Sequence, residues 1–146
     1  MRVLPPVYFL VCLVLMGALH LLVPIVRWIP GPWNATGVIP LTVGILVAVT
    51  ANRLFHRRGT PVHPFGEAST LVVDGPFKYT RNPMYLGLIL TLIGIAILLG
   101  TLSPWIVIPP FAWILARLFV RREERVLQEK FGQKYVAYKQ KVRRWI

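Results

Sequence analysis

Long apolar runs separated by short polar stretches dominate the pattern of residues along the chain. The longest run, 84–116, contains no Asp, Glu, Lys or Arg, and as one helix it would extend about 50 Å, well beyond a hydrocarbon core about 30 Å thick. The run must therefore turn back once, and the turn-forming residues within 100–104 mark the place. Gly87, Gly94 and Gly100 would permit close helix packing. The pattern predicts membrane-spanning helices at 7–26, 38–54, 84–99 and 105–120.

The C-terminal segment, 121–145, has a different pattern, because its apolar residues recur at spacings of three and four with Lys and Arg between them. This period is typical of an amphipathic helix lying in the membrane interface, although Gly132 weakens the helix locally. The predicted fold is therefore an all-α integral membrane protein. It forms a single domain over 1–146, with four spans, a helical hairpin at 84–120 and this interfacial helix.

The composition points the same way, since 55% of the 146 residues are hydrophobic, 15% are charged and the mean hydropathy is +0.61. These values exclude an ordinary soluble domain of this size. A cleaved signal peptide would also explain why Arg2 precedes the first apolar run. That run, however, ends in Pro24, Arg27 and Trp28 rather than in a small-residue cleavage site, which favours a retained helix.

Lys and Arg are distributed unevenly between the expected loops. Of the 17, only Arg27 falls in the loops on one side, at 27–37 and 100–104, whereas the others lie at the N-terminus, around the 55–82 loop or from Arg117 onward. The positive-inside rule therefore predicts that both termini and the 55–82 loop are cytoplasmic, at the inner membrane if the source is bacterial. The net charge of +12 suits anionic headgroups, and the hydropathy favours membrane lipids over nucleic acid as the partner.

The 55–82 loop is longer than a simple connector needs, and its Gly and Pro residues argue against a continuous helix, which is typical of a functional loop. Pro83 suits the first turn of the third span, and Asn82 suits a cap for the free N–H groups of that turn. The same helix start, with its positive dipole, also suits a carboxylate or phosphate ligand. Tyr85 in this turn is typical of interfacial aromatic residues.

Charged residues near the end of the fourth span are candidates for chemistry. Glu123 is one of five acids and falls on the apolar face of the C-terminal helix, which fits either an acid paired with Arg121 or Arg122 or a functional carboxylate. Arg117 either extends to the lipid headgroups or pairs with an acidic ligand group. The spacing of the three histidines predicts no metal site, and the lack of a glycine-rich phosphate loop excludes a Rossmann-type domain.

Three blocks, LVVDGPFKYTRNPMY, REERVL and FGQKYVAYKQKVRRW, occur in this order around the hairpin. In these blocks the chain resembles the superfamily of isoprenylcysteine carboxyl methyltransferases and phospholipid methyltransferases. The resemblance implies an all-helical membrane fold that binds S-adenosylmethionine without a Rossmann domain. The cofactor contacts that it implies are Val62, Ser69, Thr70, Leu71, Val72, Phe77, Asn82, Pro83, Met84, Tyr85 and Glu123.

Two positions depart from the superfamily's pattern. The usual RHP reads RNP, so Asn82 stands where a histidine would, and asparagine keeps a donor and an acceptor but cannot change charge. The arginine that contacts substrate in the prenylcysteine enzymes would align near Phe119, so Arg117 or Arg121 would have to replace it from a neighbouring turn. The candidate catalytic residues are therefore Glu123, Arg117 and Arg121.

The function implied by the resemblance is transfer of a methyl group from S-adenosylmethionine to a carboxylate, amine or thiol on a lipophilic acceptor at the cytoplasmic membrane face. Backbone donors at 82–85, the Glu123 carboxylate and apolar walls from Leu71, Val72 and Phe77 are the types of group that this cofactor needs. One alternative is an NADPH-dependent membrane reductase with a related hairpin. Another is a non-catalytic scaffold that binds anionic lipid through its basic C-terminal helix.

Overall fold

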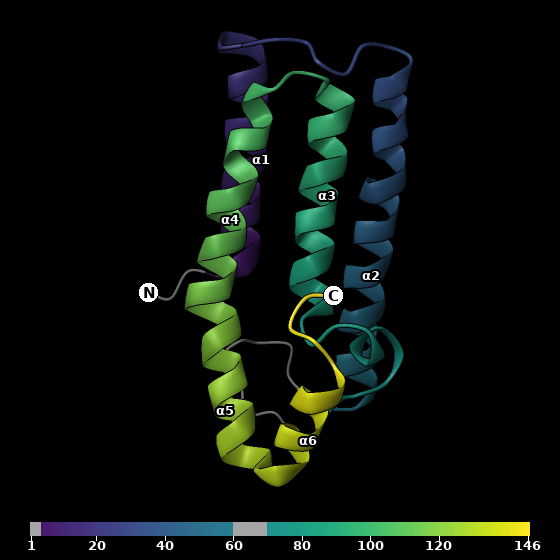
Figure 1. Cartoon of the computed structure of the whole chain (residues 1–146), viewed down its shortest axis with the longest axis vertical. Coiled ribbons are helices and arrows are strands. Elements are labelled where there is room, and N and C mark those ends of the chain that lie inside the picture. Colours follow the sequence, from purple (N-terminus) through teal and green to yellow (C-terminus); the bar gives the residue numbers. More distant parts are fainter. Residues whose placement is uncertain (1–3, 60–69) are drawn as a thin grey trace.

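The structure, a computed structural model, describes residues 4–59 and 70–146 and is all-helical over this part of the chain, which confirms the predicted fold class. Long helical segments stand side by side in it (Figure 1). The first three are α1 (Pro5–Leu22), α2 (Val38–Arg57, after the 3-10 turn η1, Trp33–Gly37) and α3 (Pro83–Leu99). The fourth runs without a break through η3 (Ser103–Val107), α4 (Ile108–Ile114), the π-helical turn η4 (Leu115–Val120) and α5 (Arg121–Phe131). The short elements are η2 (Gly75–Lys78) and α6 (Gln133–Lys141).

Helix length and exposure identify a multi-pass membrane protein. Within the described residues, three helical segments are long and apolar enough to cross a bilayer, Pro5–Leu22, Trp33–Arg57 and Ser103–Phe131, and α3 is a shorter apolar helix. Large apolar side chains cover the outer faces, with Val14 exposed to 72% and Leu22 to 79%. Such surfaces suit contact with lipid chains rather than with water.

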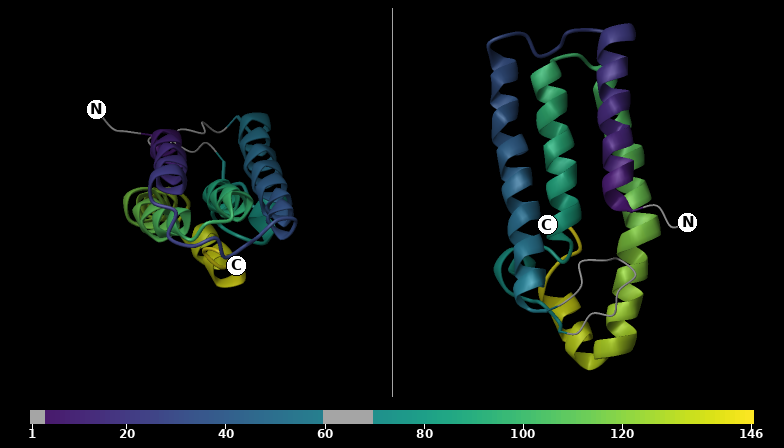
Figure 2. Two further views of the ribbon diagram at one scale, coloured as in Figure 1. Left: turned by 90° about the horizontal axis from the view of Figure 1, so that it is seen from above. Right: turned by 180° about the vertical axis from the view of Figure 1, so that it is seen from behind.

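Helix α3 lies at the centre of the bundle, with α2 on one side and with α1 and α4 on the other (Figure 2). Towards α1 and α4 the core is fully packed, because Met16, Leu92 and Leu115 have no exposed surface. Lipid chains are as apolar as leucine, so this core stabilises the bundle through close van der Waals contact rather than through removal of apolar surface from water.

Glycines set the distance between α2 and α3. A Cβ atom at Gly44 would lie 2.6 Å from the carbonyl oxygen of Gly87, and one at Gly87 would lie 2.6 Å from the carbonyl oxygen of Gly44. Gly37, the last residue of η1 and the one before α2, faces Gly94 in the same way, at 2.5 and 2.7 Å. The two backbones therefore touch at two levels, so the close packing expected of Gly87 and Gly94 takes place within the chain.

The first span is shorter than predicted. It was expected over 7–26 but ends at Leu22. Pro24 has no N–H group to continue the helical hydrogen bonds, and the chain beyond it extends instead, with Arg27 bridging to Thr101 at the tip of the hairpin.

The C-terminal helix, expected over 121–145, is also interrupted. Its first part, α5, continues the fourth span in line (Figure 1), and the helix breaks at Gly132, whose φ of +50° is strained for any other residue. Its second part, α6, folds back and ends at Lys141. The C-terminal tail, residues 142–146, then runs to the beginning of α3 (Figures 1 and 2).

Candidate functional site

The start of α3, the first half of α5 and the C-terminal tail meet at one end of the bundle. Pro83 begins α3, where its missing N–H group costs little. The predicted cap by Asn82 is wrong, because its side-chain Nδ2 donates to the carbonyl oxygen of Arg144 at 2.9 Å instead. The first-turn N–H groups of Met84 and Tyr85 therefore have no side-chain cap.

A side-chain hydrogen bond joins α3 to α5 at this point. The hydroxyl of Tyr85, which is buried, donates to Oε1 of Glu123, which is partly buried. Pairing of Glu123 with Arg121 is not observed, and α5 continues from η4, so it has no free helix start at which an acid would be favoured. Arg81 and Arg144 form ion pairs with the neighbouring acid, Glu124, instead. The Glu123 carboxylate thus faces α3 with a hydroxyl rather than a cation as its partner.

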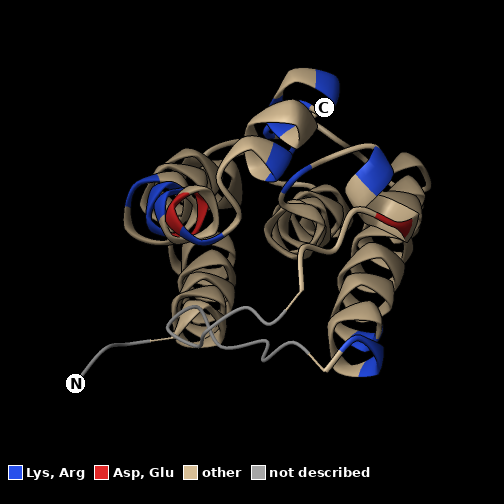
Figure 3. Ribbon diagram, turned by 90° about the horizontal axis from the view of Figure 1, so that it is seen from below, with Lys and Arg blue, Asp and Glu red and all other residues tan. Residues whose placement is uncertain are grey.

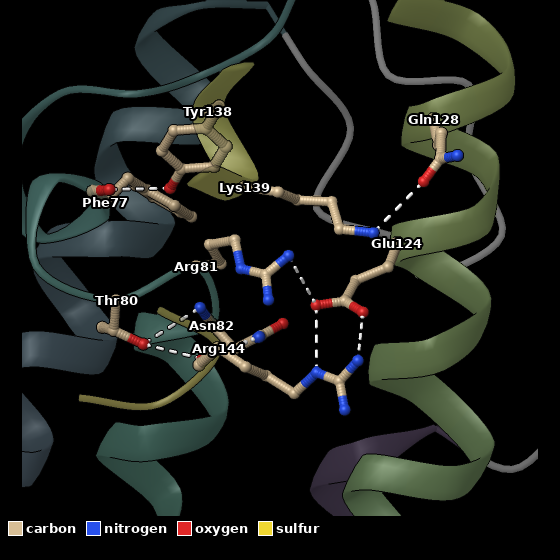
Figure 4. A network of polar contacts seen from close by, with 9 residues as sticks. All are labelled: Phe77, Thr80, Arg81, Asn82, Glu124, Gln128, Tyr138, Lys139 and Arg144. Atoms are coloured by element: carbon tan, nitrogen blue, oxygen red, sulfur yellow. Dashed lines mark hydrogen bonds and ion pairs between the residues drawn. The ribbon is translucent and has the colours of Figure 1, made fainter. Parts of the chain in front are cut away.

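The neighbouring acid, Glu124, is 8% exposed and holds the tail. Its carboxylate accepts two hydrogen bonds from Arg144, from Nε at 3.1 Å and from Nη2 at 2.6 Å (Figure 4). Nη1 of Arg81 lies 3.2 Å from the same carboxylate, as an ion pair without hydrogen-bond geometry. Hydrogen bonding to Glu124 raises the pKa of Arg144, as expected where a carboxylate stabilises the charged guanidinium.

The main chain of the tail is attached to the residues that precede α3 (Figure 4). Thr80 Oγ1 donates to the carbonyl oxygen of Arg144 at 3.1 Å, alongside the bond from Asn82. The N–H group of Arg81 donates to the carbonyl oxygen of Arg143 at 3.1 Å. The tail is therefore hydrogen-bonded to three consecutive residues, 80–82, just before the start of α3.

Helix α6 packs beneath the same network. The Tyr138 hydroxyl donates to the carbonyl oxygen of Phe77 at 2.7 Å, which ties α6 to η2. Tyr135 is only 1% exposed. Burial first, and then the nearby Glu124 charge, raises the pKa of Tyr135 to about 12, so this phenol stays neutral at ordinary pH.

The two arginines predicted as catalytic lie away from Glu123. Arg117 is exposed, and its guanidinium lies 5.6 Å from the centre of the Trp113 ring. Arg121 is exposed and lines a polar cleft of about 480 Å³ between α5 and α6. Phe119, the position aligned with the superfamily's substrate arginine, is 3% exposed and packs against an α1 tyrosine at 5.8 Å.

The loop residues expected at the cofactor divide into three groups. Two lie outside the described residues, namely Val62 and Ser69. Thr70 is exposed and Leu71 is partly buried. Val72 and Phe77 are buried in a small apolar cluster with Ala51 of α2, close to the start of α3. The structure thus brings Val72, Phe77 and the 82–85 turn to the same end of the bundle.

Sequence reasoning missed the two arginines that bind Glu124. Arg81 and Arg144 each stand in one of the three quoted blocks, next to residues that were singled out. The available signal was the acid pair itself, because successive helical residues point about 100° apart and only one of two adjacent acids can face α3. The chain has 17 Lys and Arg residues and five acids, however, so the sequence alone does not show which cations pair with Glu124.

Comparison with known proteins identifies the family of the chain. The family model described as "Phospholipid methyltransferase" matches residues 33–134, which is more than half of the chain. An uncharacterized protein of Haemophilus influenzae is 41% identical over 63 residues, which cover 43% of this chain and all of that protein. The protein-S-isoprenylcysteine O-methyltransferase of Schizosaccharomyces pombe is 32% identical over 72 residues, which cover 49% of this chain and 30% of that enzyme. The suspected superfamily is confirmed, and the chain belongs to the phospholipid methyltransferase family.

Proposed function

We propose that this membrane methyltransferase uses S-adenosylmethionine to methylate a lipophilic acceptor at the cytoplasmic face of the membrane. Family membership supports the reaction class, and the relative from Schizosaccharomyces pombe supports a lipid-modified type of acceptor. The observation that carries the proposal is the meeting of Tyr85 and Glu123 beside the uncapped start of α3.

The residues at this end fit the cofactor by chemical type. N–H groups at an uncapped helix start bind carboxylates, and Met84 and Tyr85 carry the first-turn N–H groups that would serve this role. Over residues 4–59 and 70–146, the hydrogen-bond partner of the Glu123 carboxylate is the Tyr85 hydroxyl rather than a cation, so this carboxylate is suited to a positively charged group. The cofactor, when bound, supplies an electrophilic methyl group on a sulfonium.

The chain's own residues contribute binding, orientation and exclusion of water. Tyr85 fixes the direction of the Glu123 carboxylate by donating to it, and Phe119 packs beside the Tyr85 ring at 6.2 Å. These buried rings keep water from one side of the carboxylate, which strengthens its electrostatic interactions. Rate acceleration would then come mainly from holding donor and acceptor in line.

The distribution of charge supports a cytoplasmic location for this end and for both termini. Viewed from the α5–α6 end, the ribbons of Lys and Arg gather on α2, α5, α6 and the tail (Figure 3). Positively charged loops favour the cytoplasmic side, where anionic headgroups would lie against them. A lipophilic acceptor would approach this end from the bilayer.

The test uses the purified full chain in phospholipid nanodiscs. We expect calorimetry to show binding of S-adenosylmethionine that NADPH does not displace, and tritium from the labelled methyl group to appear in an acceptor. Separate assays would contain phosphatidylethanolamine, a prenylated cysteine or a fatty acid. Binding of NADPH alone would instead support a reductase. Salt-sensitive lipid binding without either cofactor would support a scaffold.

A further inference from the structure

We propose that the ion pair between Arg144 and Glu124 positions the start of α3, so that α6 and the C-terminal tail, residues 133–146, act as a strap inside the molecule. The inference rests on the proposed function, because the element it positions is the one proposed to bind the cofactor. Arg144 and Glu124 are therefore positioning residues, which act through Asn82 and the first turn of α3.

Arg144 connects two elements that are far apart in the sequence. Its guanidinium is held by both carboxylate oxygens of Glu124 on α5. Its carbonyl oxygen accepts hydrogen bonds from Thr80 and from Asn82, just before α3. The ion pair therefore helps to fix the residue whose carbonyl oxygen is the acceptor for both of these side chains (Figure 4).

The attachment continues into the helix through short steps. The N–H group of Asn82 donates to Oγ1 of Thr80 at 3.2 Å, and the carbonyl oxygen of Asn82 accepts the first helical hydrogen bond, from Leu86, at 3.0 Å. The direction of the first-turn N–H groups therefore follows the placement of Asn82. Because N–H groups bind an anion only when they point at it, small displacements here would weaken binding.

Arg81 is a second reason why the position of residues 80–82 should depend on the charge of Glu124. Its side chain is 10% exposed, and within the described part of the chain the Glu124 carboxylate is the negative charge that lies against it, next to the buried Tyr135. Removal of one partner from a buried ion pair leaves the other charge uncompensated. Loss of the Glu124 charge would therefore disturb Arg81 directly, as well as release Arg144.

The apolar side chains of α6 and the tail pack against the rest of the chain, as a strap requires. Tyr135 is fully buried, Tyr138 binds the carbonyl oxygen of Phe77, and Trp145 packs against the main core. These residues gave the segment its amphipathic pattern, and the fold uses them for contacts within the chain. Together α6 and the tail hold both ends of the segment 77–82.

The test measures cofactor affinity in the full chain in nanodiscs for Glu124→Gln, Asn82→Ala and the double variant. We expect each single variant to weaken S-adenosylmethionine binding about tenfold, an effect of the size of one lost hydrogen bond. The double variant should bind about as weakly as either single variant, because both changes release the same attachment. Arg144→Lys keeps the positive charge but loses the bidentate contact with Glu124, so its affinity for S-adenosylmethionine should be intermediate. Arg143→Gln, which removes an exposed neighbouring cation, is the matched control.

Hydrogen exchange without cofactor gives a second readout. Peptides covering 79–86 should exchange faster in Glu124→Gln than in the parent chain, and at the parental rate in Arg143→Gln. If the parent chain does not bind S-adenosylmethionine, the proposed function fails, and the exchange rates still decide whether the strap exists. If the parent binds and Glu124→Gln and Arg144→Lys leave affinity unchanged, the inference is overturned, even where the melting temperature falls.

Discussion

Replacing Glu123 with Gln is expected to lower the rate of methyl transfer about 100-fold, or ~2.7 kcal/mol of barrier, while the protein stays folded. Glutamine has the size of glutamate and can still accept the hydrogen bond from Tyr85, so the contact between α3 and α5 persists. What disappears is the negative charge, and charged contacts in desolvated sites contribute effects of this size. Initial rates with labelled S-adenosylmethionine, at saturating acceptor, provide the measurement.

Two further variants separate charge from position. Tyr85→Phe keeps the ring beside Phe119 but removes the hydroxyl that orients Glu123, and a loss of about tenfold is expected. Glu129→Gln removes an exposed acid from the same helix and should leave the rate unchanged. A Glu123→Gln protein with the parental rate and affinity would contradict the role assigned to this carboxylate.

Much of the fold was predictable because a bilayer restricts what an apolar run can do. Once 84–116 is too long for one crossing, a hairpin is the remaining solution, and α3 begins one residue before the predicted start. The end of α1 was less predictable, because the apolar run continues past Pro24, whereas the helix ends at Leu22 and the chain beyond it pairs with the tip of the hairpin, Arg27 with Thr101.

The candidate site was predictable in its residue types but not in its pairing. The pattern placed Glu123 on an inward face, and the structure brings it to Tyr85. The pattern also assigned Asn82 to a cap, because a polar residue before Pro83 usually has that role. The tail overrides this local preference, since a carbonyl oxygen 62 residues away takes the Asn82 donor. A contact of that separation leaves no periodic trace in a single sequence.

Replacing Gly87 with Leu is expected to destabilise the fold by about 3 kcal/mol, the upper part of the usual range for overpacking. A side chain there would meet the Gly44 carbonyl oxygen and the backbone of α2, which cannot move aside as a flexible side chain would. The helices would have to separate along their length, because Gly37 and Gly94 form a second contact on the same interface. A fall in melting temperature of about 10 °C is expected.

The single cysteine offers a direct measurement of this effect. Cys12 is 8% exposed and packs in the main core, so a thiol-reactive dye would label it as the bundle opens on heating. Gly17→Leu is the matched control, since a Cβ atom at Gly17 has no neighbour within 4 Å. If Gly87→Leu and Gly17→Leu melt together at the parental temperature, then close backbone contact does not hold α2 against α3. The start of α3 would in that case be positioned by its contacts with α5 and the tail and by the apolar cluster of Ala51, Val72 and Phe77.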